Sequence, residues 1–240
     1  ALAAARAAGN EARSAVFVDA GVEGHQALVE AARGRDGVEV HVIEPGEDGL
    51  ARMAGVLEDG DGDYAAVHVL GHGDDARLGV GSSRLSADNL GEHRSDLAAI
   101  GGAVAPGGDL LLYGCNIAEG PAGRAFVGEL SEHAGGIDVA ASSDDTGASA
   151  AGGDWDLEVT SGAVDTAVIA AEGFDGVLAA ASFSETPGDQ TIGEDTNLDF
   201  SSLNLQADGG DSDMIASVEL TSGTGGIATN TEAGVDLCVG

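Results

Sequence analysis

The chain has 240 residues, of which 43% are apolar, and this suffices for the core of one domain plus a smaller appendage. Its 42 acidic and nine basic residues give a net charge of −33, and the nine basic residues are all arginines. This field repels nucleic acid and anionic membranes, which excludes both as partners. A charge of this size fits a salt-adapted organism or a calcium-rich extracellular setting, because ions there screen the repulsion between acidic residues. The other interpretation is that the acidic residues serve solubility alone.

The two cysteines, Cys115 and Cys238, are too far apart in the sequence to indicate a disulfide framework. No run of about 18 apolar residues is present, so we predict no helix that spans or inserts into a membrane. Residues 1–13 form an Ala-rich lead-in without the pattern of an export signal.

Apolar runs and helical periodicities alternate from residue 14 to about residue 160. The apolar runs predict strands at 14–20, 38–45, 64–73, 108–116 and 137–142, and a hairpin arm at 154–162. The periodicities predict helices at 24–34, 48–60, 86–104 and 120–136. This alternation predicts an α/β domain over 14–178, with a mostly parallel sheet and helices on both faces.

The pattern changes after about residue 180, where no helical period remains. Short alternating runs such as "NLDFSSLNL" and "SVELTSG" lie between clusters of Gly, Asp and Thr. This is typical of an antiparallel β-sandwich, although some 60 residues are few for a complete one. We therefore expect residues 179–240 to be a short, incomplete β-sandwich segment.

Two predicted strands end in residues that carry chemistry. The run "VHVLGHG" ends in His72 and Gly73, and "LLLYGCN" ends in Gly114 and Cys115. The carboxyl ends of parallel strands share one edge of a sheet, so neighbouring strands would bring the imidazole and the thiol together. His72 could then take the thiol proton while the N–H groups of Gly73 and Cys115 form an oxyanion hole. The alternative is that Cys115 is a small core residue.

The order of these blocks resembles the caspase–gingipain–separase group of cysteine peptidases. The blocks "VLGHGDDARLGVGSSRLSADNL" and "LLLYGCNIAEGPAGRAFVGEL" are similar to the self-cleaving cysteine protease domain of multifunctional RTX toxins. The runs "VHVLGHG", "LLLYGCN", "VAASSDDTGA" and "GGDWDLE" resemble the domain of unknown function 4347, which occurs in large bacterial surface and adhesin-like proteins. The segment "SFSETPGDQTIGEDTNLDFSSLNL" resembles the first strands of Ig-like or cadherin-like repeats.

The resemblance implies a caspase-hemoglobinase-like fold and a secreted or cell-surface protein. It also implies a peptidase with Cys115 as nucleophile and His72 as base, which hydrolyses a peptide bond of its own polypeptide. The toxin domain is activated by inositol hexakisphosphate in a Lys- and Arg-rich pocket, which nine scattered arginines cannot form, so a cation such as calcium is the expected activator if there is one. The alternative function is a catalytically inactive module that caps or displays an adhesin.

Two acidic segments are further candidates. Asp144, Asp145 and Thr146 follow the fifth predicted strand, at the same sheet edge as His72 and Cys115. They either line a substrate pocket or only form the turn. Asp208, Asp211 and Asp213 in "ADGGDSD" are candidate calcium ligands.

Overall fold

The computed structural model describes residues 13–60, 62–179, 182–183 and 207–208. The chain divides into two compact units, Ala1–Ala180 and Ala181–Gly240. In the second unit the described residues are two short antiparallel strands, β10 (Ser182–Phe183) and β11 (Ala207–Asp208). The remainder of the predicted β-sandwich segment and residues 1–12 of the Ala-rich lead-in lie outside the described residues.

The first unit is built on a six-stranded sheet with the order β2-β1-β3-β7-β8-β9. Its strands are β1 (Ser14–Asp19), β2 (Val38–Ile43), β3 (Tyr64–Leu70), β7 (Val104–Tyr113), β8 (Asp138–Ala141) and β9 (Val159–Ser161). All neighbouring pairs are parallel except β8 and β9, which are antiparallel.

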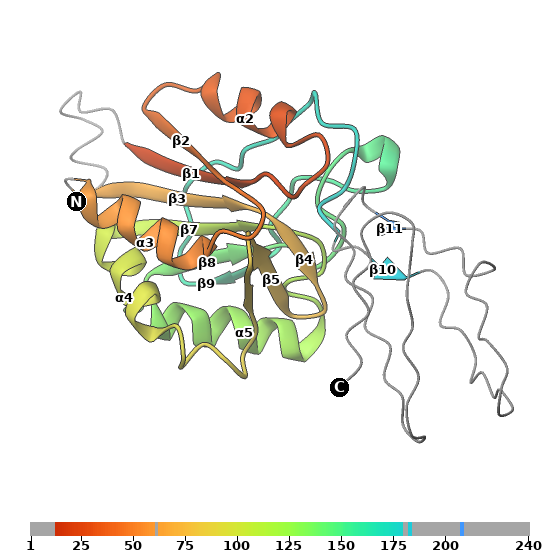
Figure 1. The fold of residues 1–240 in the computed structure, drawn as a ribbon. Coiled ribbons are helices and arrows are strands. Elements are labelled where there is room, and N and C mark those ends of the chain that lie inside the picture. The colour runs from red at the N-terminus through yellow and green to blue at the C-terminus, as the bar shows by residue number, and fades with distance from the viewer. Residues whose placement is uncertain (1–12, 61, 180–181, 184–206, 209–240) are drawn as a thin grey trace, which may run out of the picture. The chain divides into compact units, whose positions relative to one another are not determined.

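Helices cover both faces of this sheet, as Figure 1 shows. They are α2 (His25–Arg33), α3 (Gly49–Asp59), α4 (Arg94–Ala103) and α5 (Gly120–His133). The α2 helix covers one face, and the other three helices cover the opposite face (Figure 1). A short 3₁₀ turn, Ser149–Ala151, precedes β9. The predicted α/β fold with a mostly parallel, helix-covered sheet is confirmed.

Two apolar clusters, one on each face, hold these layers together. Phe17 of β1 belongs to the cluster formed with α3, α4 and α5, whereas its neighbours Val16 and Val18 belong to the cluster formed with α2. This follows from strand geometry, because successive side chains point to opposite faces. Each large apolar side chain buried in this way stabilises the fold by about 1.5–3 kcal/mol. The second cluster also contains Leu178, at the end of the unit.

One predicted helix was too long. Helix α4 begins at Arg94, not at Ser86, and turns occupy the intervening residues. The Asn89 side chain accepts a hydrogen bond from the Ser86 N–H and donates one to the Arg84 carbonyl. Such local side-chain bonds offer the backbone an alternative to helix, which explains the later start.

A small antiparallel sheet leaves the main sheet where the predicted strand 64–73 was expected to continue. It consists of β4 (His72–Asp74), β5 (Arg77–Val80) and β6 (Ser83–Leu85), in that order. Gly71 joins β3 to β4, and a Cβ at Gly71 would lie 2.4 Å from the Gly79 carbonyl oxygen. A glycine is therefore required where the chain passes from one sheet to the other.

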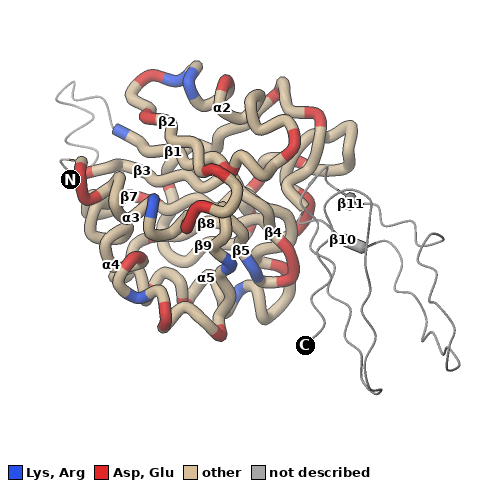
Figure 2. Tube along the Cα trace, viewed as in Figure 1, with Lys and Arg blue, Asp and Glu red and all other residues tan. Residues whose placement is uncertain are grey.

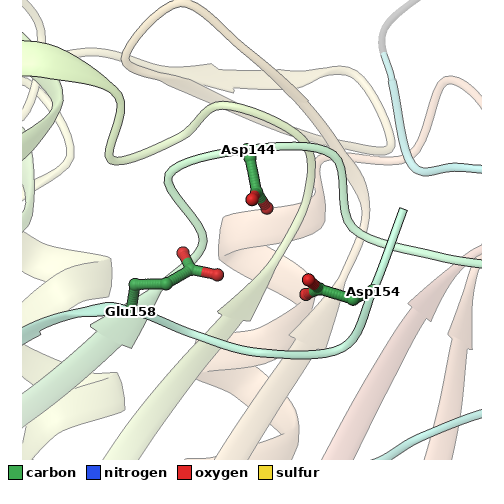
Figure 3. Close-up of side chains that lie close together, drawn as sticks. All are labelled: Asp144, Asp154 and Glu158. Atoms are coloured by element: carbon green, nitrogen blue, oxygen red, sulfur yellow. The ribbon is translucent and has the colours of Figure 1, made fainter. Parts of the chain in front are cut away.

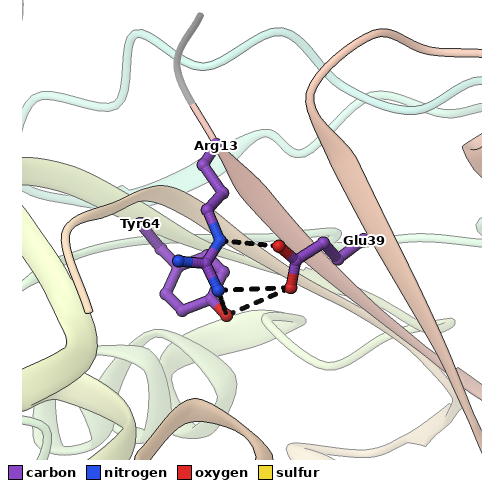
Figure 4. Close-up of polar contacts among 3 residues, drawn as sticks. All are labelled: Arg13, Glu39 and Tyr64. Carbon is purple, nitrogen blue, oxygen red and sulfur yellow. Dashed lines mark hydrogen bonds and ion pairs between the residues drawn. The ribbon is translucent and has the colours of Figure 1, made fainter. Parts of the chain in front are cut away.

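Arg13, which directly precedes β1, contacts Glu39 near the start of β2 and Tyr64 at the start of β3, at the amino edge of the sheet (Figure 4). Its guanidinium donates to the Glu39 carboxylate at 2.7 Å and to the Tyr64 hydroxyl at 2.5 Å. The hydrogen bond from Arg13 and the positive charge of its guanidinium lower the pKa of Glu39. Because both charged side chains are about one-third exposed or more, the pair contributes only about 0–1 kcal/mol.

Acidic residues lie on loops and helices all around the first unit, with few arginines among them (Figure 2). No helix in the described parts of the chain is both long and apolar enough to cross a bilayer.

Candidate functional site

The candidate site lies where β3 and β7 end, at the carboxyl edge of the sheet. These two strands are direct parallel neighbours, with Leu70 opposite Tyr113. The pairing continues beyond both strands, because the Gly71 N–H donates to the Tyr113 carbonyl at 3.1 Å. The structure therefore brings His72-Gly73 and Gly114-Cys115 out of the sheet side by side.

The backbones of Gly73 and Cys115 are in close contact. A Cβ at Gly73 would lie 2.4 Å from the Cys115 carbonyl oxygen and 2.7 Å from the Cys115 nitrogen. A Cβ at Gly114 would lie 2.9 Å from the Gly73 nitrogen. Real Cβ atoms essentially never approach backbone atoms so closely, so both positions require glycine. Because neither glycine has a side chain, the backbone N–H groups of Gly73 and Cys115 are unobstructed.

These two N–H groups point at the same oxygen atom. The Gly73 N–H donates to the Leu178 carbonyl oxygen at 2.9 Å, and the Cys115 N–H donates to the same oxygen at 3.3 Å. Two backbone donors that converge on one carbonyl have the geometry that stabilises an oxyanion during acyl transfer. The predicted pair of donors, Gly73 and Cys115, thus occurs together in the structure.

The Cys115 thiol is fully buried, with none of its surface exposed. Its S–H donates to the Thr146 carbonyl oxygen at 3.7 Å. Burial, with a smaller contribution from the nearby Asp145 carboxylate, raises the pKa of the thiol to about 12. At neutral pH the sulfur is therefore a neutral thiol rather than a thiolate.

The His72 imidazole is also buried, with 8% of the residue exposed. Its Nδ1 lies 2.8 Å from the Ala179 carbonyl oxygen. Because a carbonyl only accepts, Nδ1 carries the proton in this bond, and in a neutral ring Nε2 holds the free lone pair. Nε2 is buried and has no hydrogen-bond partner. The ring therefore has a basic nitrogen shielded from water.

The three predicted pocket residues lie in one loop, which runs alongside the loop after β7. The Asn116 N–H donates to the Asp144 carbonyl at 2.8 Å, and the Thr146 hydroxyl donates to the Gly114 carbonyl at 3.2 Å. Thr146 is fully buried beside the thiol, and the Asp145 carboxylate accepts from the Asn116 amide at 3.3 Å. The structure brings Asp145 and Thr146 to Cys115, whereas the Asp144 side chain belongs to another cluster.

That cluster is the acidic trio of Asp144, Asp154 and Glu158, whose carboxylates point toward one another (Figure 3). One oxygen of each lies within 4.8 Å of the others, and all three residues are exposed. Burial and the two neighbouring carboxylates raise the pKa of Asp144. Oxygen ligands of this kind suit calcium, but exposed acidic groups commonly gather without an ion. Of the predicted calcium ligands, Asp211 and Asp213 lie outside the described residues, and Asp208 is described only as the last residue of β11.

The segment Gly176–Ala179 was not predicted to be part of the site, and the expected boundary between the two parts of the chain, at residues 178 and 179, falls within it. Its Leu178 N–H donates to the Thr146 carbonyl at 2.8 Å, and its Gly176 carbonyl accepts from the Ala148 N–H at 2.8 Å. Val177 pairs antiparallel with Gly147, and Ala179 pairs parallel with Gly73. Isolated bridges on both sides thus hold the segment between the 146–148 loop and β4. The apolar, small-residue run "GVLAA" is the one sequence signal for it, and it resembles many linkers.

We expect Cys115 to react slowly with iodoacetamide in the folded protein. With a pKa of about 12, the thiolate fraction at pH 7 is on the order of 10⁻⁵. Because burial favours the neutral form, the rate should keep rising with pH well beyond 9. Peptide mass spectrometry at increasing pH, with denatured protein as reference, measures this rate. A plateau with an apparent pKa near 7 would contradict the prediction.

The fold and this site define an α/β protein with a thiol, an imidazole and two converging backbone donors at the carboxyl edge of a mostly parallel sheet. Residues 15–178 match a protein family described as Domain of unknown function (DUF4347). The match covers more than half of the chain, and the chain belongs to this family. No curated protein matches the chain.

Proposed function

We propose that the first unit is a cysteine peptidase-like domain, with a caspase-hemoglobinase-like fold, that hydrolyses a peptide bond through a Cys115–His72 dyad. The observation that carries the proposal is the convergence of two N–H groups on a single carbonyl oxygen, because one donor is Gly73 and the other belongs to Cys115 itself. Such a pair has an obvious use in acyl transfer, where a carbonyl oxygen gains negative charge in the transition state.

In the proposed reaction, the Cys115 sulfur attacks a peptide carbonyl carbon as His72 takes the thiol proton. The carbonyl oxygen becomes an oxyanion held by the two N–H groups. When the C–N bond breaks, the imidazolium returns the proton to the leaving amine and a thioester remains. Water then hydrolyses the thioester with His72 as base, which releases a carboxylic acid and restores the thiol.

The substrate in this proposal is a polypeptide, and first of all the protein's own chain. A net charge of −33 argues against nucleic acid, anionic membranes and inositol phosphates as ligands, and it fits a secreted or cell-surface setting rich in cations. The chemistry itself needs no cofactor. Calcium enters the proposal only as a cation that would screen the acidic surface and bind carboxylates.

The second candidate function is a catalytically inactive module that caps or displays a larger surface protein. One observation favours it: the Cys115 thiol is fully buried, and its hydrogen bond goes to Thr146. In this case the glycines and the two N–H groups serve only to join the sheet to the segment that ends the unit.

A comparison of cysteine variants separates the two functions. Cys115→Ala should abolish hydrolysis of a fluorescent casein substrate and any self-fragmentation of the 240-residue chain, and His72→Ala should lower both at least 100-fold. Cys238→Ala is the matched control and should leave both unchanged. The assays are run with and without millimolar calcium. Wild-type protein that is inactive in every condition, or activity that survives Cys115→Ala, would overturn the peptidase proposal in favour of the display role.

A further inference from the structure

We propose that the peptide bond between Leu178 and Ala179 is the substrate of this site, so that the protein cuts itself at the end of its first unit. This inference rests on the proposed function and names the bond that the dyad would hydrolyse. It depends on where the structure places the atoms on either side of that bond.

The acyl side of the bond lies in the oxyanion hole. The Leu178 carbonyl oxygen accepts hydrogen bonds from the Gly73 and Cys115 N–H groups at 2.9 and 3.3 Å. The Thr146 carbonyl accepts both the Leu178 N–H, at 2.8 Å, and the Cys115 S–H, at 3.7 Å. One oxygen atom therefore joins the thiol to the residue whose carbonyl carbon would be attacked.

The amine side of the bond lies at the imidazole. The Ala179 carbonyl accepts from His72 Nδ1 at 2.8 Å, and Ala179 pairs with Gly73. The nucleophile is thus beside the residue that precedes the bond, and the base contacts the residue that follows it. In the proposed step, the proton that His72 Nε2 takes from the thiol passes to the Ala179 nitrogen when the bond breaks.

The Leu178 side chain lies in an apolar environment, as expected for the substrate side chain that a peptidase recognises. It is fully buried, and it belongs to the apolar cluster that contains Tyr113, Cys115 and Phe174. The bonds of Gly176 and Leu178 to the 146–148 loop pair the segment antiparallel with that loop, as a bound extended peptide commonly pairs with an exposed edge. Apolar burial would select leucine, while main-chain bonds would fix the register.

The position of the bond in the chain also fits a processing site. The family match ends at residue 178, and the first compact unit ends at residue 180. Hydrolysis between Leu178 and Ala179 would release residues 179–240 as one piece and leave the matched domain intact.

The test is intact-mass spectrometry of the full 240-residue chain, incubated at neutral pH with and without calcium. The expected result is two fragments, one ending at Leu178 and one beginning at Ala179, from the wild-type protein and none from Cys115→Ala. Leu178→Ala should slow cleavage at least tenfold. Leu97→Ala, which creates an equally buried cavity on the opposite face of the sheet, should change the rate less than threefold.

The other outcomes separate this inference from the proposed function. Fragments with different ends that disappear in Cys115→Ala, or casein hydrolysis by a chain that stays uncut, would overturn the Leu178–Ala179 assignment and leave the peptidase standing. An uncut chain that also fails to hydrolyse casein would overturn both.

Discussion

Replacement of Gly73 by alanine should lower the free energy of unfolding by about 3 kcal/mol and abolish any cleavage that depends on Cys115. The added Cβ would lie 2.4 Å from the Cys115 carbonyl oxygen and 2.6 Å from the Gly114 carbonyl carbon. Both are backbone atoms, which cannot rotate away as a flexible side chain can. The two chains must therefore separate, and their N–H groups can no longer meet at one oxygen. Denaturant unfolding and fragment analysis measure the two effects.

The matched control is Gly55→Ala, in the middle of α3. A Cβ at Gly55 would meet nothing within 4 Å, and the residue is exposed. Because alanine favours helix more than glycine does, this variant should gain about 0.5–1 kcal/mol. If Gly73→Ala unfolded at the same denaturant concentration as the wild type, the close contact between Gly73 and Cys115 would be refuted.

The second large effect is expected for Leu178→Ala. Leu178 is fully buried, so its truncation should cost about 2–5 kcal/mol. Part of this cost falls locally on the segment Gly176–Ala179, which covers the thiol. Since each 1.4 kcal/mol changes an equilibrium tenfold, we expect alkylation of Cys115 at pH 7 to accelerate at least about tenfold.

Leu97→Ala again provides the comparison. Leu97 is 1% exposed and lies in the other apolar cluster, so its loss should destabilise the whole domain without opening the site. The informative quantity is the excess of the Leu178→Ala alkylation rate over the Leu97→Ala rate at equal stability. Equal rates would mean that the thiol becomes accessible only by global unfolding, and that Leu178 does not close the site.

The sheet and its helices were predictable because their signals are local. Apolar runs of strand length alternate with helical periodicities, and that alternation determines a parallel sheet. The neighbourhood of His72 and Cys115 followed from the same logic, since β3 and β7 end at one edge. The sequence does not show that β3 and β7 are neighbours. The structure shows it, because the two strands pair directly with Leu70 opposite Tyr113.

The segment that fills the site was not predictable in the same way. Its main contacts are made by the backbone of Thr146, Leu178 and Gly73. Nearly all residues have the same backbone groups, so such contacts cannot be inferred from residue types. Its path depends on a distant anchor, the Tyr113 hydroxyl, which accepts from the Ile169 N–H at 2.9 Å and also contacts His68. Burial lowers the pKa of His68 to about 4, so this ring is neutral at pH 7 and hydrogen-bonds the Tyr113 hydroxyl through Nδ1. Such a long-range contact has no periodicity that a sequence pattern would reveal.

The antiparallel pairing of Gly176–Leu178 with the 146–148 loop has a consequence for turnover. None of those backbone bonds involves the bond after Leu178, so hydrolysis would leave them in place. The newly formed terminal carboxylate would stay against the same two N–H donors, and its full negative charge would strengthen the two hydrogen bonds. A protein arranged in this way would be inhibited by its own product after it had cut itself, so its hydrolysis of casein should be slow compared with cleavage of its own chain.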